Sequence, residues 1–193
     1  MSARCILLPT LISYFNHANI IEYCKRPFRK PDGSVDVPNM NDTIIMNWNS
    51  RVKKGDTVYH LGDFGMGSWK EWAGFRERLN GRIILIKGNH DRRTESWMLR
   101  GDEVHDHLFV DGVYMAHVPP NHADYEKRDR KGHDLPVAHP VPEGTKLMLC
   151  GHVHDSWRAA VINGIPVLNV GVDVRYFSPV TMDELRGDLH HGL

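Results

Sequence analysis

The chain has 193 residues, enough for one domain with a complete core and too few for two domains of ordinary size. Its 24 basic and 24 acidic residues balance, so the total charge indicates neither a nucleic-acid-binding nor a membrane-binding surface. No apolar run approaches the roughly 18 residues of a membrane-spanning helix, and three scattered cysteines without a Cys-x-x-Cys spacing favour a reducing, cytoplasmic location.

The first part of the chain is expected to contain one strand and two helices. An apolar stretch over residues 4–12 predicts a buried strand. Helix signals follow over 18–24 and over 40–52, and in the second segment apolar residues recur at helical spacing. That stripe consists of Ile44, Ile45, Trp48 and Val52.

Two further strands are expected on either side of a capped helix. The first is the β-rich run "TVYHL" (57–61). Ser68 and Glu71 have the spacing of a capping box, and the helix that they begin is expected to end before the turn residues 80–81. The following run "RIILIK" (82–87) predicts a buried strand.

The second half of the chain is expected to consist mostly of strands. A short helix is predicted after Thr94, and residues 119–144, rich in Pro, His and charge, predict a long surface loop. Residues 189–191 are expected to form a solvated tail. The predicted strands lie around 103–109, 112–116, 146–150 and 165–170. This order of elements predicts a single α/β domain over residues 1–193.

Four groups of polar residues follow predicted strands, at the strand ends where α/β sheets usually bind ligands. They are Gly62-Asp63, Gly88-Asn89-His90-Asp91, the single His117, and Gly151-His152-Val153-His154. Each group alone has a simpler explanation: a turn for the first two, a half-buried histidine for His117, and two exposed side chains on one strand face for His152 and His154. All four together favour a metal site. Imidazole, carboxylate and amide oxygen suit manganese, iron, zinc or nickel, and a preceding glycine lets the backbone approach an ion closely.

This series of motifs resembles that of the calcineurin-like metallophosphoesterase superfamily. The stretches "NHANIIEYCKRPF", "NWNSRVKKGDTVYHLGDF" and "LNGRIILIKGNHD" are similar to its small single-domain bacterial and phage branch. The resemblance implies a β-sandwich flanked by helices, in α/β/β/α layers. It also implies up to two divalent ions at the strand ends, with manganese expected and iron, zinc or nickel as alternatives.

The resemblance also implies a role for each matched residue. The implied metal ligands are Asp63 bridging both ions, His154 on the first ion, and Asn89, His117 and His152 on the second. His90 would protonate the leaving oxygen or stabilise the transition state, and Asp91 would orient His90. Together the two ions would activate a hydroxide for attack on a phosphoester.

The superfamily's first motif, Asp-x-His, is missing before Phe15-Asn16-His17. Ile12 stands where the aspartate belongs and Tyr14 where the histidine belongs. Isoleucine cannot bind a metal, and tyrosine binds one only as phenolate, so the first metal site is expected to be weak. Two explanations are open. The chain is a natural variant, or its coding frame is shifted at the start, since residues 9–13 read one base out of register can spell Asp-Thr-His-Phe.

Two functions follow from these patterns. The first is a metal-dependent phosphoesterase that hydrolyses a phosphomonoester or phosphodiester. The alternative is a catalytically impaired phosphate- or nucleotide-binding module that retains one metal. A structural zinc site is disfavoured because no cysteine clusters with the histidines along the chain. The expected partner is a small phosphoester or nucleotide. The basic residues of the 119–144 loop, Lys127, Arg128, Arg130 and Lys131, make nucleic acid a weaker alternative, and no membrane partner is expected.

Overall fold

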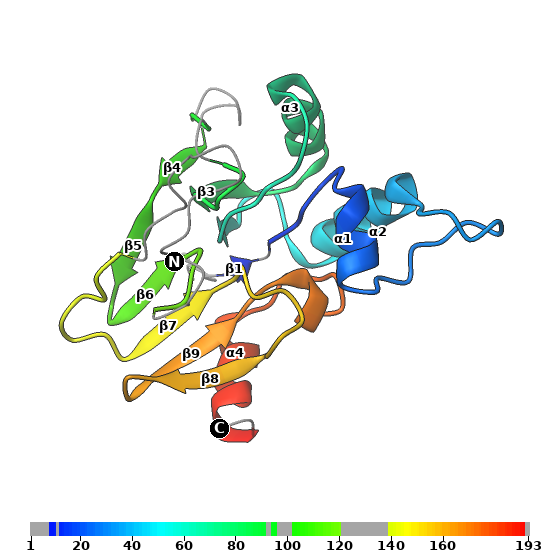
Figure 1. Ribbon diagram of the computed structural model, residues 1–193. Coiled ribbons are helices and arrows are strands. Elements are labelled where there is room, and N and C mark those ends of the chain that lie inside the picture. Colours follow the sequence, from blue (N-terminus) through cyan, green and yellow to red (C-terminus); the bar gives the residue numbers. More distant parts are fainter. Residues whose placement is uncertain (1–7, 11, 92–93, 96–101, 121–138, 192–193) are drawn as a thin grey trace, which may run out of the picture.

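The computed structural model describes residues 8–10, 12–91, 94–95, 102–120 and 139–191, which form two β-sheets flanked by helices (Figure 1). The first sheet has four parallel strands in the order β1-β2-β3-β4. These strands are β1 (Leu8–Thr10), β2 (Thr57–His60), β3 (Arg82–Ile86) and β4 (Glu103–His105).

The second sheet has five strands in the order β5-β6-β7-β9-β8. Its central strands β6, β7 and β9 are parallel to one another, and the outer strands β5 and β8 are antiparallel to their neighbours. The strands are β5 (His107–Val110), β6 (Val113–Ala116), β7 (Leu147–Cys150), β8 (Ala159–Ile162) and β9 (Ile165–Asn169).

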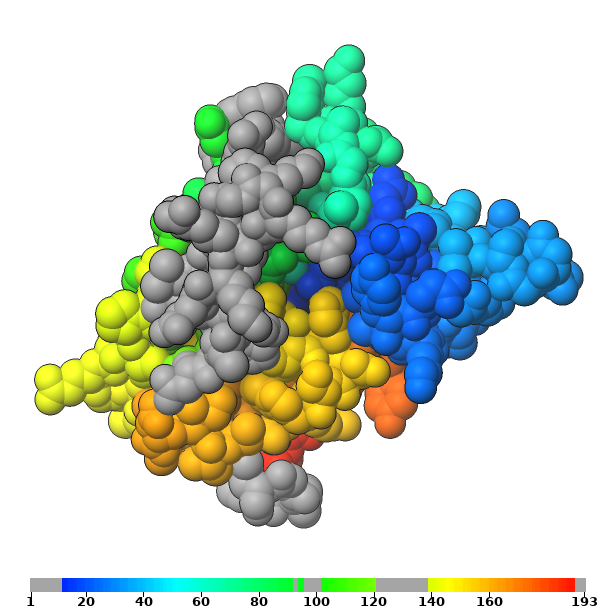
Figure 2. Space-filling view, in the orientation of Figure 1, coloured from blue at the N-terminus to red at the C-terminus, as the bar shows by residue number. Residues whose placement is uncertain are grey.

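Among the described residues, three helices pack on the first sheet, and two further helices follow the strands of the second sheet in the chain. Those that precede β4 in the chain, α1 (Ala18–Tyr23), α2 (Val37–Arg51) and α3 (Trp69–Arg78), contribute to the core on one face of the first sheet. Helices α1 and α2, with the loop between them, form one end of the molecule (blue in Figure 2). A 3₁₀ helix, η3 (Val172–Val174), and α4 (Met182–His191) follow the second sheet. No helix in the described ranges is both long and apolar enough to cross a membrane.

The alternation of side chains along β3 shows why the molecule is layered. Ile83 and Leu85 pack with the apolar residues of the first three helices, whereas Ile84 and Ile86 pack with β6, β7 and β9 of the second sheet. All four are buried, and each contributes about 1.5–3 kcal/mol relative to an exposed side chain. The strand is therefore apolar on both faces because each face meets a separate part of the core.

Several predicted elements are confirmed. The apolar stripe of α2 is buried in full. Ser68 and Glu71 form the capping box at the start of α3, each side chain accepting a hydrogen bond from the other residue's backbone amide. Strand β1 covers residues 8–10 of the predicted first strand. The helix predicted after Thr94 and most of the 119–144 loop lie outside the described residues.

Two predictions were wrong. The single strand expected over 103–109 is two strands in different sheets, because Glu103–His105 pairs with β3 and His107–Val110 pairs with β6. Residues 189–191, expected to be a solvated tail, end helix α4. That helix forms because Leu185 is fully buried in the apolar cluster between the sheets. The short edge strand β8 was also missed.

Candidate metal centre

Four of the predicted ligands come from four strand ends of two sheets. Asp63 follows β2 and Asn89 follows β3, while His117 follows β6 and His152 follows β7. Because the parallel strands of each sheet end at the same edge, their following loops converge. The structure brings these four side chains together, and the ligand atoms of Asp63, His117 and His152 all lie within 4.8 Å of one another.

The donor atoms are spaced as in a coordination shell. His117 Nε2 lies 3.2 Å from Asp63 Oδ2, 3.1 Å from Asn89 Oδ1 and 3.3 Å from His152 Nδ1. His152 Nδ1 lies 3.1 Å from Asn89 Oδ1. Ligands at about 2.1 Å from an ion lie roughly 3.0–3.4 Å apart in octahedral or tetrahedral geometry. The four donors therefore fit one divalent ion.

The position of the proton on the His117 ring favours a cation among the four donor atoms. Its Nδ1 lies 2.7 Å from the Leu61 carbonyl oxygen, so Nδ1 carries the proton and Nε2 presents a lone pair toward the oxygens of Asp63 and Asn89. Lone pairs that face one another repel unless a cation lies between them. Burial opposes protonation of His117, but the Asp63 carboxylate outweighs it and raises the pKa of His117 above its usual value. The site attracts positive charge.

Two glycines allow the loops to approach. A Cβ on Gly62 would lie 2.5 Å from the Gly88 backbone nitrogen and 2.6 Å from His117 Nδ1. A Cβ on Gly88 would overlap the Asp63 carboxylate. Both glycines thus permit a close approach of the two loops to each other, while the expected approach of the backbone to an ion stays a prediction.

The backbone around the site is strained. Asp63, His152 and His154 have φ values of 48°, 62° and 48°, in the left-handed region that side chains other than glycine rarely adopt. Such strain persists only where surrounding structure enforces it, and it concentrates at functional sites.

Burial alone would raise the pKa of Asp63, but His117, His90 and the Tyr14 hydroxyl outweigh it and hold that pKa below its usual value.

The Tyr14 hydroxyl lies between Asp63 and His154, the two residues that match the superfamily's ligands for the first ion. The hydroxyl donates to Asp63 Oδ2 at 2.6 Å and lies 3.3 Å from His154 Nε2. Burial, followed by the charge of Asp63, raises the pKa of Tyr14 well above its usual value, so the side chain stays a phenol. Ile12 is buried against Gly151 and offers no ligand. The residues at the first position do not fit a metal ion.

The side chain of His90 is exposed, whereas that of Asp91 is buried. The His90 backbone amide donates to Asp63 Oδ1 at 2.8 Å, and the His90 ring lies 6.1 Å from the Tyr14 ring. Asp91 is fully buried, and its carboxylate accepts hydrogen bonds from the backbone amides of Phe64 and Gly88. Asp91 therefore joins the loops after β2 and β3, and in the described residues its carboxylate oxygens bond to these amides rather than to the His90 imidazole. Its expected role in orienting His90 stays a prediction.

The sequence patterns missed two residues beside His154. Cys24 and Asp173 offer a sulfur and an oxygen that lie within 4.8 Å of one another and of a His154 nitrogen. Asp173 follows β9 in "NVGVD", which repeats the pattern of a strand, a glycine and a ligand-type residue. That signal was available in the sequence. Cys24 carries no comparable signal, because it only ends α1.

The chain matches a protein family and is similar to several known proteins. Residues 40–181 match the model of the calcineurin-like phosphoesterase superfamily domain. An uncharacterized protein of Methanocaldococcus jannaschii is 45% identical to this chain over 99 residues. The matched part is 50% of this chain and 52% of that protein, so the chain matches about half of its relative's length. A protein of unknown function from Aquifex aeolicus, of known crystal structure, is 26% identical with a TM-score of 0.64, covering 94% of this chain and 97% of that one. The nuclease MPE of Pseudomonas putida is 18% identical with a TM-score of 0.37, over 89% and 72% of the two chains.

Proposed function

Since the chain belongs to the calcineurin-like phosphoesterase superfamily, we propose that it is a phosphoesterase that works with one tightly held divalent ion. Asp63, Asn89, His117 and His152 would hold this ion. The observation that carries the proposal is the spacing of 3.1–3.3 Å between His117 Nε2 and the other three donors. The substrate would be a small phosphomonoester, phosphodiester or nucleotide.

Manganese is the proposed ion. The donor set combines imidazole nitrogens with carboxylate and amide oxygens and contains no thiol, which suits a borderline to hard cation. When bound, the ion supplies positive charge that polarises a phosphoryl oxygen and lowers the pKa of water. The protein keeps the donors in place through the Leu61 carbonyl, which fixes the His117 ring, and through the backbone amide of His90, which fixes Asp63.

His90 is the proposed proton donor to the leaving oxygen. Its side chain is exposed, its backbone amide donates to Asp63, and its imidazole acts electrostatically on the Asp63 carboxylate, which supports a ring close to the proposed ion. The Tyr14 and His17 rings lie 6.1 Å and 6.0 Å from the His90 ring. A phosphate held at the ion would therefore meet His90 from the solvent side.

The second candidate is a phosphate- or nucleotide-binding module that retains this ion but turns over slowly or not at all. The observation that favours it is the Tyr14 hydroxyl between Asp63 and His154. Two-metal sites clamp both the attacking and the leaving oxygen, whereas a single ion provides only part of that stabilisation.

The test is a manganese count combined with turnover of a chromogenic phosphomonoester and phosphodiester. After manganese loading and desalting, we expect the parent protein to retain close to one ion per chain, and His152→Ala to retain almost none and to lose turnover. His105→Ala is the matched control, because that imidazole pairs with Glu103 on β4 rather than with the site. Full manganese content in His152→Ala would contradict the assigned site.

A further inference from the structure

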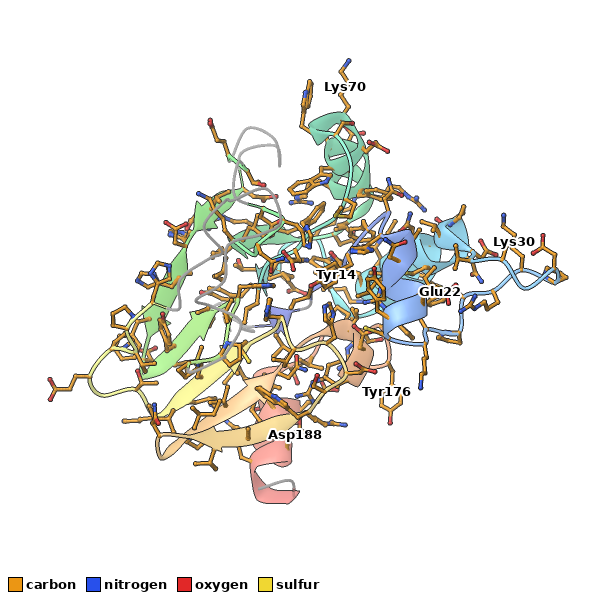
Figure 3. The ribbon with its side chains drawn as sticks, viewed as in Figure 1. Tyr14, Glu22, Lys30, Lys70, Tyr176 and Asp188 are labelled. Carbon is orange, nitrogen blue, oxygen red and sulfur yellow. The ribbon has the colours of Figure 1, made fainter. Side chains whose placement is uncertain are left out.

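Three ligand-type side chains meet on the far side of His154 from Tyr14. Cys24 ends helix α1, His154 follows β7, and Asp173 lies in η3. Their Sγ, imidazole nitrogen and carboxylate oxygen lie within 4.8 Å of one another, and all three residues are partly exposed. Figure 3 labels Tyr14, which is buried, and Tyr176, which is exposed at the surface.

The hydrogen bonds of Tyr14 determine which nitrogen of His154 carries a proton. The Tyr14 hydroxyl donates its own proton to Asp63, so its oxygen can only accept from His154 Nε2, 3.3 Å away. Nε2 then carries the imidazole proton and Nδ1 carries the lone pair. Nδ1 is buried without a hydrogen-bond partner, and it lies 3.8 Å from Asp173 Oδ2. A lone pair and a carboxylate oxygen thus face each other, an arrangement that either a second proton on the imidazole or a metal ion between them would satisfy.

Asp173 is held in place for such a contact. The buried guanidinium of Arg26 donates to both of its oxygens, from Nε at 2.7 Å and from Nη2 at 2.9 Å. A carboxylate has about four lone-pair positions, so this fork leaves lone pairs for a further partner. Carboxylates that bind metals are commonly fixed by such outer hydrogen bonds.

We propose that Cys24, His154 and Asp173 form a zinc site, separate from the site of the proposed phosphoesterase activity. A thiolate, an imidazole and a carboxylate are three zinc ligands of the kind that leave a fourth position for water or a small anion. The sulfur selects zinc over manganese. The whole His154 ring and the Tyr14 hydroxyl lie between this site and Asp63, so the two ions would share no ligand.

The charges around the site balance in part with zinc in place. Coordination releases the Cys24 thiol proton to solution, so the dication and the new thiolate together add one positive charge. The Arg26–Asp173 pair is neutral. The exposed carboxylate of Asp155 acts on Cys24 electrostatically and supplies negative charge. The positive charge that zinc binding adds is therefore partly offset by a nearby carboxylate.

The experiment compares metal content and cobalt spectra in the full chain. We expect the parent to bind two equivalents of zinc but one of manganese, and Cys24→Ser to bind one of each. Substitution with Co²⁺ should give a sulfur-to-cobalt charge-transfer band in the near ultraviolet, absent in Cys24→Ser. Cys150→Ser is the matched control, since Cys150 is buried in the second sheet and should leave the band unchanged.

A second measurement needs no variant. Zinc should slow the alkylation of Cys24 in the parent protein, followed by mass spectrometry of the peptide that contains it, and manganese should not. A cobalt–sulfur band that persists in Cys24→Ser, or alkylation of Cys24 that zinc leaves unchanged, would overturn the proposal. His152→Ala separates the two sites, because it should lose manganese and retain the band. Retained manganese in that variant would contradict the proposed phosphoesterase site and leave this result untouched.

Discussion

His117 donates its Nδ1 proton to a backbone carbonyl, whereas His154 donates its Nε2 proton to the Tyr14 hydroxyl. The two rings therefore present different nitrogens to their surroundings. His117 turns a lone pair toward Asp63, and His154 turns one toward Asp173. A single hydroxyl, that of Tyr14, directs the lone pair of His154 away from Asp63. The identity of residue 14 thus changes which ligands His154 can join.

The role of His90 can be tested separately from metal binding. His90→Asn should retain manganese, since the hydrogen bond to the proposed ligand Asp63 comes from the backbone amide of residue 90, which the substitution keeps. Turnover should fall by about 10²–10⁴-fold on esters with poor leaving groups, which need a proton, and little on an activated phenolate ester. Steady-state kinetics on both esters measure this difference. An equal loss on both esters would point to a structural effect instead.

At this scale the sequence predicts residues by what they follow in the chain. Asp63, Asn89, His117 and His152 each come one to three residues after a strand, so their convergence could be foreseen, although their roles stay predictions. Asp91 shows the limit of this reasoning, because its neighbour in sequence is not its partner in space. The approach of Cys24 to His154 and Asp173 depends on the packing of α1 against η3, which no local pattern records.

Among the elements, the loops after β2 and β3 tolerate no added atoms where they meet. Gly88→Ala would place a Cβ against the Asp63 carboxylate and 2.5 Å from the Asp63 backbone nitrogen. We expect a loss of about 1–3 kcal/mol in the free energy of unfolding from overpacking, and weaker manganese binding. Denaturant unfolding and a manganese titration measure the two effects.

Gly74 provides the matched control for this prediction. It lies in α3, where a Cβ would meet nothing within 4 Å. Gly74→Ala should therefore raise the free energy of unfolding by about 0.5–1 kcal/mol and leave manganese binding unchanged. Parent-like manganese affinity in Gly88→Ala would show that the contact between the two loops does not set the position of Asp63.

The elements that the sequence predicts well are those defined by a local pattern, either a stripe of apolar residues at helical spacing or a capping motif. The stripe of α2 and the capping box of α3 are examples, because local periodicity and local hydrogen bonds define them. Residues 103–110 are only partly buried, and their division between two sheets depends on which strand each half pairs with. Such pairing partners are distant in the chain and leave no local signal.

Across the whole molecule, the proposed manganese site joins the two sheets. Asp63 and Asn89 come from the first sheet, and His117 and His152 come from the second. An ion that binds only the folded arrangement stabilises it by mass action, about 2.7 kcal/mol at a free concentration 100 times its dissociation constant. An ion at the superfamily's first metal position would stabilise the fold in the same way, but the residues now at that position do not fit an ion.

Restoring the superfamily's first motif tests that reasoning. The double substitution Ile12→Asp with Tyr14→His supplies two ligands and removes the hydroxyl between Asp63 and His154. Manganese per chain should rise from near one toward two, and turnover should rise on both kinds of ester. In chelator, the new carboxylate replaces a buried apolar side chain in the same core and repels Asp63. The free energy of unfolding should then fall by on the order of 3–5 kcal/mol, and manganese should restore it.

Tyr14→Phe is the control, because it removes the same hydroxyl without adding a ligand and should gain no manganese. A double variant that folds with manganese but binds no more of it than the parent would show that Ile12 and Tyr14 do not limit the first site. Turnover then separates the two candidate functions. If the restored protein binds a second ion without becoming faster, and His90→Asn changes nothing, the chain binds phosphate compounds rather than hydrolysing them, since neither the added ion nor the proton donor acts on a reaction.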